Sequence, residues 1–429
     1  MPRPDHASPG PRPTPGASRP TAGGGHDGGG GLIHGLDAVR FSAALAVVVY
    51  HLAHRAWAPP PIGDGPAGAD IRDFIPDSPA FPHLEPVVWF GWVGVQLFFV
   101  LSGFVIALSA EGSSPYAFLR GRVVRLAPGV LVCATITALV VAAVEGPTLE
   151  LANRTLRTLA LPVFLDGPWV DSVYWTLAVE VAFYAAVFLA LSLDRFRHAD
   201  LLAAALVAVS GGAWLAWALT GEGDWRLGTA AAKLLLVRHG CFFAAGLLLW
   251  LLMCKRDAPA WRVGLRVALL AAALSAGLAE IAHLTAYKEG VLGRPFPTEV
   301  AQLVFLGGVL AIVLSVRFNA ALRRRLGAGR WAGRLRTVGM ATFALYLVHN
   351  MVGVALMTAL EDAMGRHLAL AASVSAMVLL ALAVATLAEP PLARRVRAGL
   401  DRLAAHAHRR ARPTPAAAWA FRPTRPVEA

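Results

Sequence analysis

Runs of about twenty apolar residues recur along the chain and are separated by short polar connections. A helix of that length crosses the hydrocarbon core of a bilayer. The pattern predicts an all-α fold, a polytopic membrane helical bundle of about ten transmembrane helices, with spans at 36–54, 88–109, 126–144, 173–194, 200–219, 231–253, 263–286, 296–316, 338–360 and 368–389. A shorter leucine-rich stretch, 151–165, contains Arg154 and Arg157 and predicts a helix at the membrane interface.

The distribution of basic residues tests this count independently, because Lys and Arg gather in the cytoplasmic loops of membrane proteins. If the N-terminus is cytoplasmic, the tails and even-numbered connections hold 28 of the 39 Lys and Arg, whereas the outer connections hold 8. The sequence therefore predicts a multi-pass protein of the cell membrane, with its N- and C-termini in the cytoplasm.

Composition agrees with this class and sets the domain boundaries. Apolar residues make up 56% of the chain and charged residues 15%, and the mean hydropathy is +0.57. The lipid bilayer is the expected environment, and no nucleic-acid-binding module interrupts the apolar runs. Residues 1–31 predict a disordered Pro/Gly-rich tail, 32–393 a transmembrane domain and 394–429 a basic, disordered cytoplasmic tail. The three cysteines lack metal-ligand spacing, so no metal site is predicted.

The first apolar run, "VRFSAALAVVVYH", contains two costly polar groups. Arg40 and His51 lie eleven residues apart, so a helix places them within about 20° of each other and roughly 16 Å apart along its axis. An arginine at the cytoplasmic end is commonly only a topology signal, and a histidine is commonly satisfied by a neighbouring helix. Their shared face favours a common function.

Other polar residues in or beside the apolar runs extend this set. Arg122 and Arg125 lie one turn apart at the cytoplasmic start of the third span, where paired guanidinium groups suit a phosphate-bearing ligand. Glu180 lies inside the fourth span with Tyr184 one turn further, and it needs a partner, for which His51 is a candidate. His349 is expected near mid-membrane in the ninth span. Two histidines and a glutamate indicate proton chemistry, either catalytic or transporting.

Six segments, taken in order, resemble the acyltransferase-3 family of integral membrane O-acyltransferases, whose members acylate sugars, polysaccharides and macrolide antibiotics. The segments are "GLDAVRFSAALAVVVYH", "GVQLFFVLSGFVI", "RGRVVRLAP", "YWTLAVEVAFY", "ALYLVHN" and "EPPLARR", and the match runs through about 36–395. In that family an Arg or Lys eleven residues before a His is the hallmark, and the His is regarded as catalytic. The resemblance thus implies roles for Arg40 and His51. It equates the family's Arg-x-x-Arg pair with Arg122 and Arg125, and its glutamate with Glu180 in "WTLAVE". Gln96 departs from the family's pattern and takes no role.

The expected function is transfer of an acyl group from cytoplasmic acyl-CoA, with acetyl-CoA as the expected donor, to a hydroxyl of a carbohydrate-type acceptor. A cell-surface glycan, a glycolipid and a macrolide sugar all fit as acceptors, and no tightly bound cofactor is expected. His51 and Glu180 are the predicted catalytic residues, and His51 either takes the acceptor's proton or forms a transient acyl-histidine. The predicted substrate-binding residues are Arg40, Arg122, Arg125, Tyr184 and His349.

The alternative is a proton-coupled secondary transporter that uses the intramembrane His and Glu residues. It predicts internal repeats and interrupted helices, and the two halves of the sequence show no clear repeat.

Overall fold

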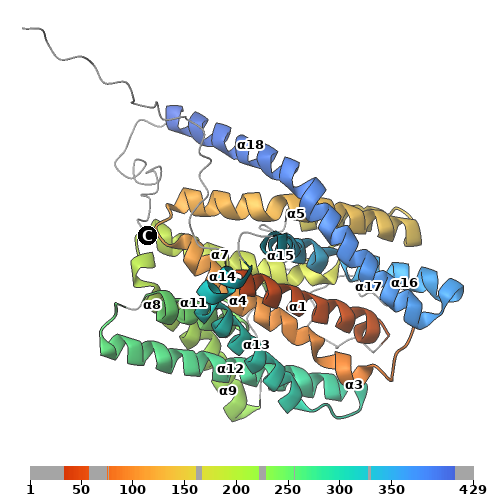
Figure 1. Cartoon of the computed structure of the whole chain (residues 1–429), viewed down its shortest axis with the longest axis horizontal. Coiled ribbons are helices and arrows are strands. Elements are labelled where there is room, and N and C mark those ends of the chain that lie inside the picture. Colours follow the sequence, from red (N-terminus) through yellow and green to blue (C-terminus); the bar gives the residue numbers. More distant parts are fainter. Residues whose placement is uncertain are drawn as a thin grey trace, which may run out of the picture. The chain divides into compact units, whose positions relative to one another are not determined.

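The computed structural model describes residues 33–57, 75, 77–160, 167–221, 229–255, 257–326 and 330–410, which are helical and contain no strand (Figure 1). The predicted N-terminal tail, 1–31, lies outside the described residues. The elements are α1 (His34–Tyr50), η1 (His51–Arg55), α3 (Glu85–Val88), η2 (Trp89–Trp92), α4 (Val93–Ala110), α5 (Pro115–Glu145), α6 (Leu149–Leu159), η3 (Ser172–Tyr174), α7 (Trp175–Ser192), η4 (Phe196–His198), α8 (Ala199–Leu206), η5 (Val207–Gly211), α9 (Gly212–Thr220), α10 (Thr229–Leu234), α11 (Gly240–Cys254), α12 (Ala260–Leu292), α13 (Thr298–Arg317), α14 (Asn319–Leu326), α15 (Arg330–Val348), α16 (Met351–Met364), α17 (Arg366–Ala383), η6 (Val384–Ala388) and α18 (Glu389–Arg410).

The predicted fold class, an all-α polytopic membrane bundle, is confirmed. Within the described ranges, eight helical segments are long and apolar enough to cross a membrane, and a bent pair, α15 with α16, makes a ninth. The sixth predicted span, 231–253, is not one continuous helix. It is split into α10 and the 15-residue α11, and between them Leu236 takes a left-handed backbone conformation with φ of 55°. A right-handed α-helix requires negative φ, so the positive φ at Leu236 interrupts the helix.

The ninth predicted span, 338–360, was also wrong as a single helix. Helix α15 ends at Val348, and α16 leaves it at an angle of 75°. His349 therefore lies at a break between two helices rather than in the middle of one. The break is fixed by buried polar contacts that periodicity does not reveal.

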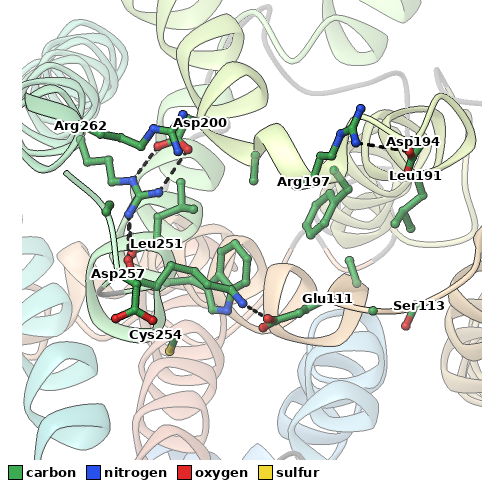
Figure 2. A pocket seen from close by; sticks show the side chains of 18 of the residues that line it. Glu111, Ser113, Leu191, Asp194, Arg197, Asp200, Leu251, Cys254, Asp257 and Arg262 are labelled. Atoms are coloured by element: carbon green, nitrogen blue, oxygen red, sulfur yellow. Dashed lines mark hydrogen bonds and ion pairs between the residues drawn. The ribbon is translucent and has the colours of Figure 1, made fainter. Parts of the chain in front are cut away.

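Connections that were predicted on one side of the membrane come together in the structure. The turns after α4, α7 and α11 and the start of α12 surround a pocket of about 810 Å³ (Figure 2). Its charged side chains pair with one another: Arg266 binds Asp200 with its Nε at 2.6 Å from Oδ1, and Lys255 binds Glu111. Arg266 also donates to the Leu251 and Lys255 carbonyls, which satisfies the C-terminal end of α11.

Connections predicted on the opposite side meet in the same way. Lys288 near the end of α12 donates from Nζ to the Tyr50 hydroxyl at 2.7 Å, and Arg294 binds Glu85. Arg366 at the start of α17 donates to the Ala80 carbonyl at 3.2 Å. The sets of loop contacts therefore agree with successive segments that run in alternate directions.

Glycines allow α4 to pack closely against two neighbours. A Cβ atom built at Gly94 would lie 2.5 Å from the Ala43 carbonyl oxygen of α1. On the other side, a Cβ at Gly103 would clash with the Phe243 carbonyl of α11, and one at Gly246 would clash with the Val100 carbonyl of α4. Backbones this close permit only glycine, which is the packing that small residues provide in membrane bundles.

The predicted boundary of the C-terminal tail needs correction. Residues 394–410, predicted as disordered, continue as helix α18 to Arg410. The helix packs on the start of α5, where Tyr116 donates to the Leu400 carbonyl at 3.0 Å and Arg120 pairs with Asp401 at 2.6 Å. These contacts join residues more than 280 positions apart, so the basic composition of the segment could not reveal them. Of the stretch 151–165, predicted as a helix at the membrane interface, residues 151–159 are helical in α6, Leu149–Leu159, while 161–166 lie outside the described residues. Its location at the interface stays a prediction.

Candidate active site

A cavity of about 300 Å³ is lined by residues of α1, α4, α5, α7 and α15. Five of the seven predicted site residues line it: Arg40, Arg122, Arg125, Glu180 and Tyr184. They come from three different helices, α1, α5 and α7, so the bundle brings together residues that are up to 144 positions apart. Its remaining walls are apolar or carry single hydroxyls, from Val95, Phe98, Phe99, Ser102, Val105, Ile106, Leu126, Thr176, Leu177, Gly339, Thr342, Phe343, Tyr346 and Leu347.

The three arginines of the cavity differ in their partners. Arg125 Nη1 lies 3.4 Å from Glu389 Oε2, a carboxylate of the "EPPLARR" segment. Arg40 Nη1 lies 3.8 Å from Asp37 Oδ1, one turn earlier on α1. Arg122 has no carboxylate within ion-pair distance among the described residues. Its guanidinium lies 5.6 Å from the Phe118 ring centroid and 5.7 Å from that of Tyr184, and its buried Nε has no hydrogen-bond partner.

Glu180 is held by hydroxyl groups rather than by a histidine. Its Oε1 accepts hydrogen bonds from the Ser102 hydroxyl at 2.8 Å and from the Tyr184 hydroxyl at 2.7 Å. The Glu180–Tyr184 pair follows from their spacing on one helix face. The proposed partnership between Glu180 and His51 is not formed, because these hydroxyls occupy Glu180 and a backbone carbonyl occupies His51.

His51 is the first residue of η1, a π-helical turn that widens the end of α1. Its Nδ1 lies 2.9 Å from the Val47 carbonyl oxygen. A carbonyl only accepts, so Nδ1 carries the proton and Nε2 is left with a free lone pair. This is the tautomer that a general base requires.

His349 packs against His51, and it is held in the same tautomer. The two ring centroids are 4.6 Å apart, with the rings nearly perpendicular at 81°. His349 Nδ1 lies 2.7 Å from the Tyr346 carbonyl oxygen, and its Nε2 is buried with no hydrogen-bond partner. The structure therefore brings together the two histidines that the sequence singled out.

A buried aspartate, which the sequence reading missed, holds the break beside His349. Asp171 is fully buried, and its carboxylate accepts from Asn350 Nδ2 at 2.9 Å and from the Met351 backbone N–H at 3.1 Å. It also accepts from the Val173 N–H at 3.1 Å, which caps the start of η3. These bonds satisfy backbone groups that the bend would otherwise leave unpaired. The signal in the sequence was an aspartate directly before the apolar fourth span.

Tyr346 connects the cavity to the histidine pair. Its side chain lines the cavity, its ring centroid lies 5.5 Å from that of His349, and its carbonyl orients the His349 ring. Phe98, also in the cavity wall, packs against the other side of Tyr346 with centroids 5.8 Å apart. The arginine-lined cavity and the two imidazoles are thus consecutive parts of one region. In the described part of the chain, no group of three or more His, Cys, Asp or Glu could hold a metal ion.

A polytopic helical bundle with arginines, a glutamate and paired histidines in its interior contains the groups that a membrane-embedded transferase needs. The sequence profile of the acyltransferase-3 family, described as an acyltransferase domain, matches residues 33–388. The chain is a member of this family. The family resemblance drawn from the sequence is confirmed. The transporter alternative predicted interrupted helices. An interruption is present between α15 and α16, and it places His349 beside His51.

Curated relatives agree with this assignment. The chain is 28% identical over 159 residues to the acyltransferase MdmB of Streptomyces mycarofaciens, a match that covers 35% of this chain and 36% of the relative. It is 28% identical over 209 residues to the putative membrane-bound transacylase BcsY of Komagataeibacter xylinus, covering 44% and 52% respectively. The chain thus spans about half or less of the length of these relatives. No solved structure matches the chain significantly.

Proposed function

We propose that the protein transfers an acyl group, with acetyl-CoA as donor, to a hydroxyl of a carbohydrate-type acceptor. The observation that carries the proposal is the arginine-lined cavity that leads through Tyr346 to the two imidazoles. CoA carries several phosphates, and guanidinium groups bind phosphate by charge-assisted forks. Arg122, the arginine without a carboxylate partner, is the strongest candidate for this contact.

The chemistry of the proposed reaction follows from the His51 tautomer. As the acceptor hydroxyl attacks the thioester carbonyl, His51 Nε2 takes its proton, and the C–S bond then breaks to release CoA. The Val47 carbonyl keeps the imidazole oriented and stabilises the imidazolium that forms. Glu180 fixes the Ser102 and Tyr184 hydroxyls in the cavity wall, which makes it a residue of the donor site under this proposal.

The acceptor is proposed from the family: a cell-surface glycan, a glycolipid or a macrolide sugar. Each of these offers hydroxyl groups of ordinary nucleophilicity, so each needs a base in the position of His51. The proposed setting is the cell membrane, with both termini in the cytoplasm and acyl-CoA arriving from that side.

The test uses purified protein in lipid nanodiscs with radiolabelled acetyl-CoA. We expect release of CoA and, with a suitable acceptor, a labelled product. His51→Ala should reduce turnover by about 10²–10⁴-fold, the usual contribution of a general base, while the protein remains folded. His198→Ala, at a histidine in η4 outside the site, is the matched control. Turnover of His51→Ala equal to that of the control would overturn the proposed role.

A further inference from the structure

The ring nitrogen Nε2 of His349 is buried without a hydrogen-bond partner, and the reaction proposed above assigns no role to it. The side chain is fully buried, and Nε2 has no partner although Nδ1 is bound to the Tyr346 carbonyl. A buried polar atom without a partner destabilises the folded protein, so a site that keeps one commonly uses it. The sequence predicted substrate binding for this residue and counted it among the groups that indicate proton chemistry.

The position of His349 differs from that of His51 with respect to the donor cavity. On α1, the cavity wall reaches only Arg40, eleven residues before His51. On α15, it reaches Tyr346 and Leu347, two residues before His349. His349 therefore lies closer to the cavity along its own helix, on the side from which the thioester would arrive.

The contact between the two rings makes them a coupled pair. With centroids 4.6 Å apart, two imidazolium charges would repel strongly, so the pair holds one extra proton at a time. Both Nε2 atoms have free lone pairs, because both Nδ1 atoms donate to carbonyls. The two Nε2 atoms are not hydrogen-bonded to each other, so a proton taken up by one ring passes to the other through a water molecule between them.

We propose that His349 is a second catalytic acid–base residue, which receives the acceptor's proton from His51 and delivers it to the departing sulfur of CoA. This inference rests on the proposed function. His51 Nε2 removes the proton as the acceptor oxygen bonds to the acyl carbon. Through the bridging water, His51 gives up a proton and His349 Nε2 gains one. When the C–S bond breaks, the electron pair stays on sulfur and His349 protonates it. The ester and CoA thiol are released, and both histidines return to their neutral state.

In this scheme, the hydrogen bonds that Asp171 accepts position His349. They hold the break at Asn350 and Met351, and this break directs the His349 ring toward His51 instead of along a continuous α15. Asp171 is thus a positioning residue that acts through the backbone.

The decisive variant is His349→Asn. The asparagine amide can still donate to the Tyr346 carbonyl, as Nδ1 does, but it has no group in the place of Nε2. We expect kcat to fall about 100-fold and KM for acetyl-CoA to stay within twofold. His198→Asn is the matched control, and His51→Asn reports on the proposed function itself. His349→Asn with a kcat within threefold of wild type, beside an inactive His51→Asn, would overturn this inference and leave the proposed function intact. Full activity in both variants would overturn both.

A second measurement uses the unmodified protein and so does not depend on the variant folding. Single-turnover rates are recorded in mixtures of H₂O and D₂O. A relay through two imidazoles has more than one proton in motion, so the rate should curve with the deuterium fraction. A linear dependence would mean that a single proton moves in the rate-limiting step, and it would overturn a relay in which the protons move together in that step.

Discussion

Two arginines that look equivalent in the sequence have different surroundings. Arg125 is paired with Glu389, whereas Arg122 stacks on aromatic rings and keeps an unsatisfied Nε. We therefore expect Arg122→Ala to weaken acetyl-CoA binding more than Arg125→Ala does. Loss of a charge-assisted bond costs about 1.5–3 kcal/mol, which is roughly a 10- to 100-fold rise in KM. Arg122→Lys should recover only part of it, because lysine lacks the planar fork.

The measurement is KM for acetyl-CoA in the single alanine variants, each normalised to inserted protein. Arg317→Ala serves as a control, since this arginine is outside the cavity. Equal KM values in wild type and both cavity variants would show that the two arginines set only topology.

The eleven-residue spacing between Arg40 and His51 makes a separate prediction at this scale. Exchanging Val39 and Arg40 keeps the charge and the topology signal, but it turns the arginine about 100° around α1 and out of the cavity. We expect transfer to fall steeply in this exchange and to be intermediate in Arg40→Lys. A fully active exchange variant would mean that the shared face with His51 has no role.

At the scale of elements, the closest packing in the bundle joins α4 to α11. A methyl group at Gly246 would meet the Val100 carbonyl, and neither backbone can yield without separating the helices. We expect Gly246→Ala to destabilise the protein by about 1–3 kcal/mol or more, seen as a lower unfolding temperature in nanodiscs. Gly264→Ala is the matched control, because a Cβ there has open space around it on α12. If both variants melt together, the close approach does not contribute to stability.

The sequence predicted well where helices occur and which residues share a helix face. It predicted poorly where helices end and which helices contact one another. Glu180 with Tyr184 and Arg122 with Arg125 follow from helical periodicity alone. The Ser102–Glu180 bond joins residues 78 positions apart, and Asp171 binds Asn350 across 179 positions. Periodicity contains no information on such contacts, because they depend on which helices become neighbours. The breaks in the sixth and ninth predicted spans were missed for the same reason, since apolar composition continues through them.

At the scale of the whole molecule, the number of membrane crossings depends on whether the 15-residue helix α11 crosses. The ends of α4, α7 and α11 meet at the pocket of Figure 2. If the ends of α4 and α11 face the same side, the segment containing α10 and α11 must cross. The prediction of ten crossings then holds despite the break at Leu236.

The native cysteines provide the test. Cys254 at the end of α11 is exposed beside the pocket, while Cys133 and Cys241 are buried. With α11 crossing and the N-terminus cytoplasmic, a membrane-impermeant maleimide should leave Cys254 unlabelled in intact cells and label it in inverted vesicles. Cys254→Ser removes the signal and serves as the blank. Asp362→Cys in that background, on the connection predicted outside, should show the opposite pattern. Labelling of Cys254 in intact cells would contradict the proposed orientation, and labelling of Cys254 and Asp362→Cys from the same side would contradict the alternation.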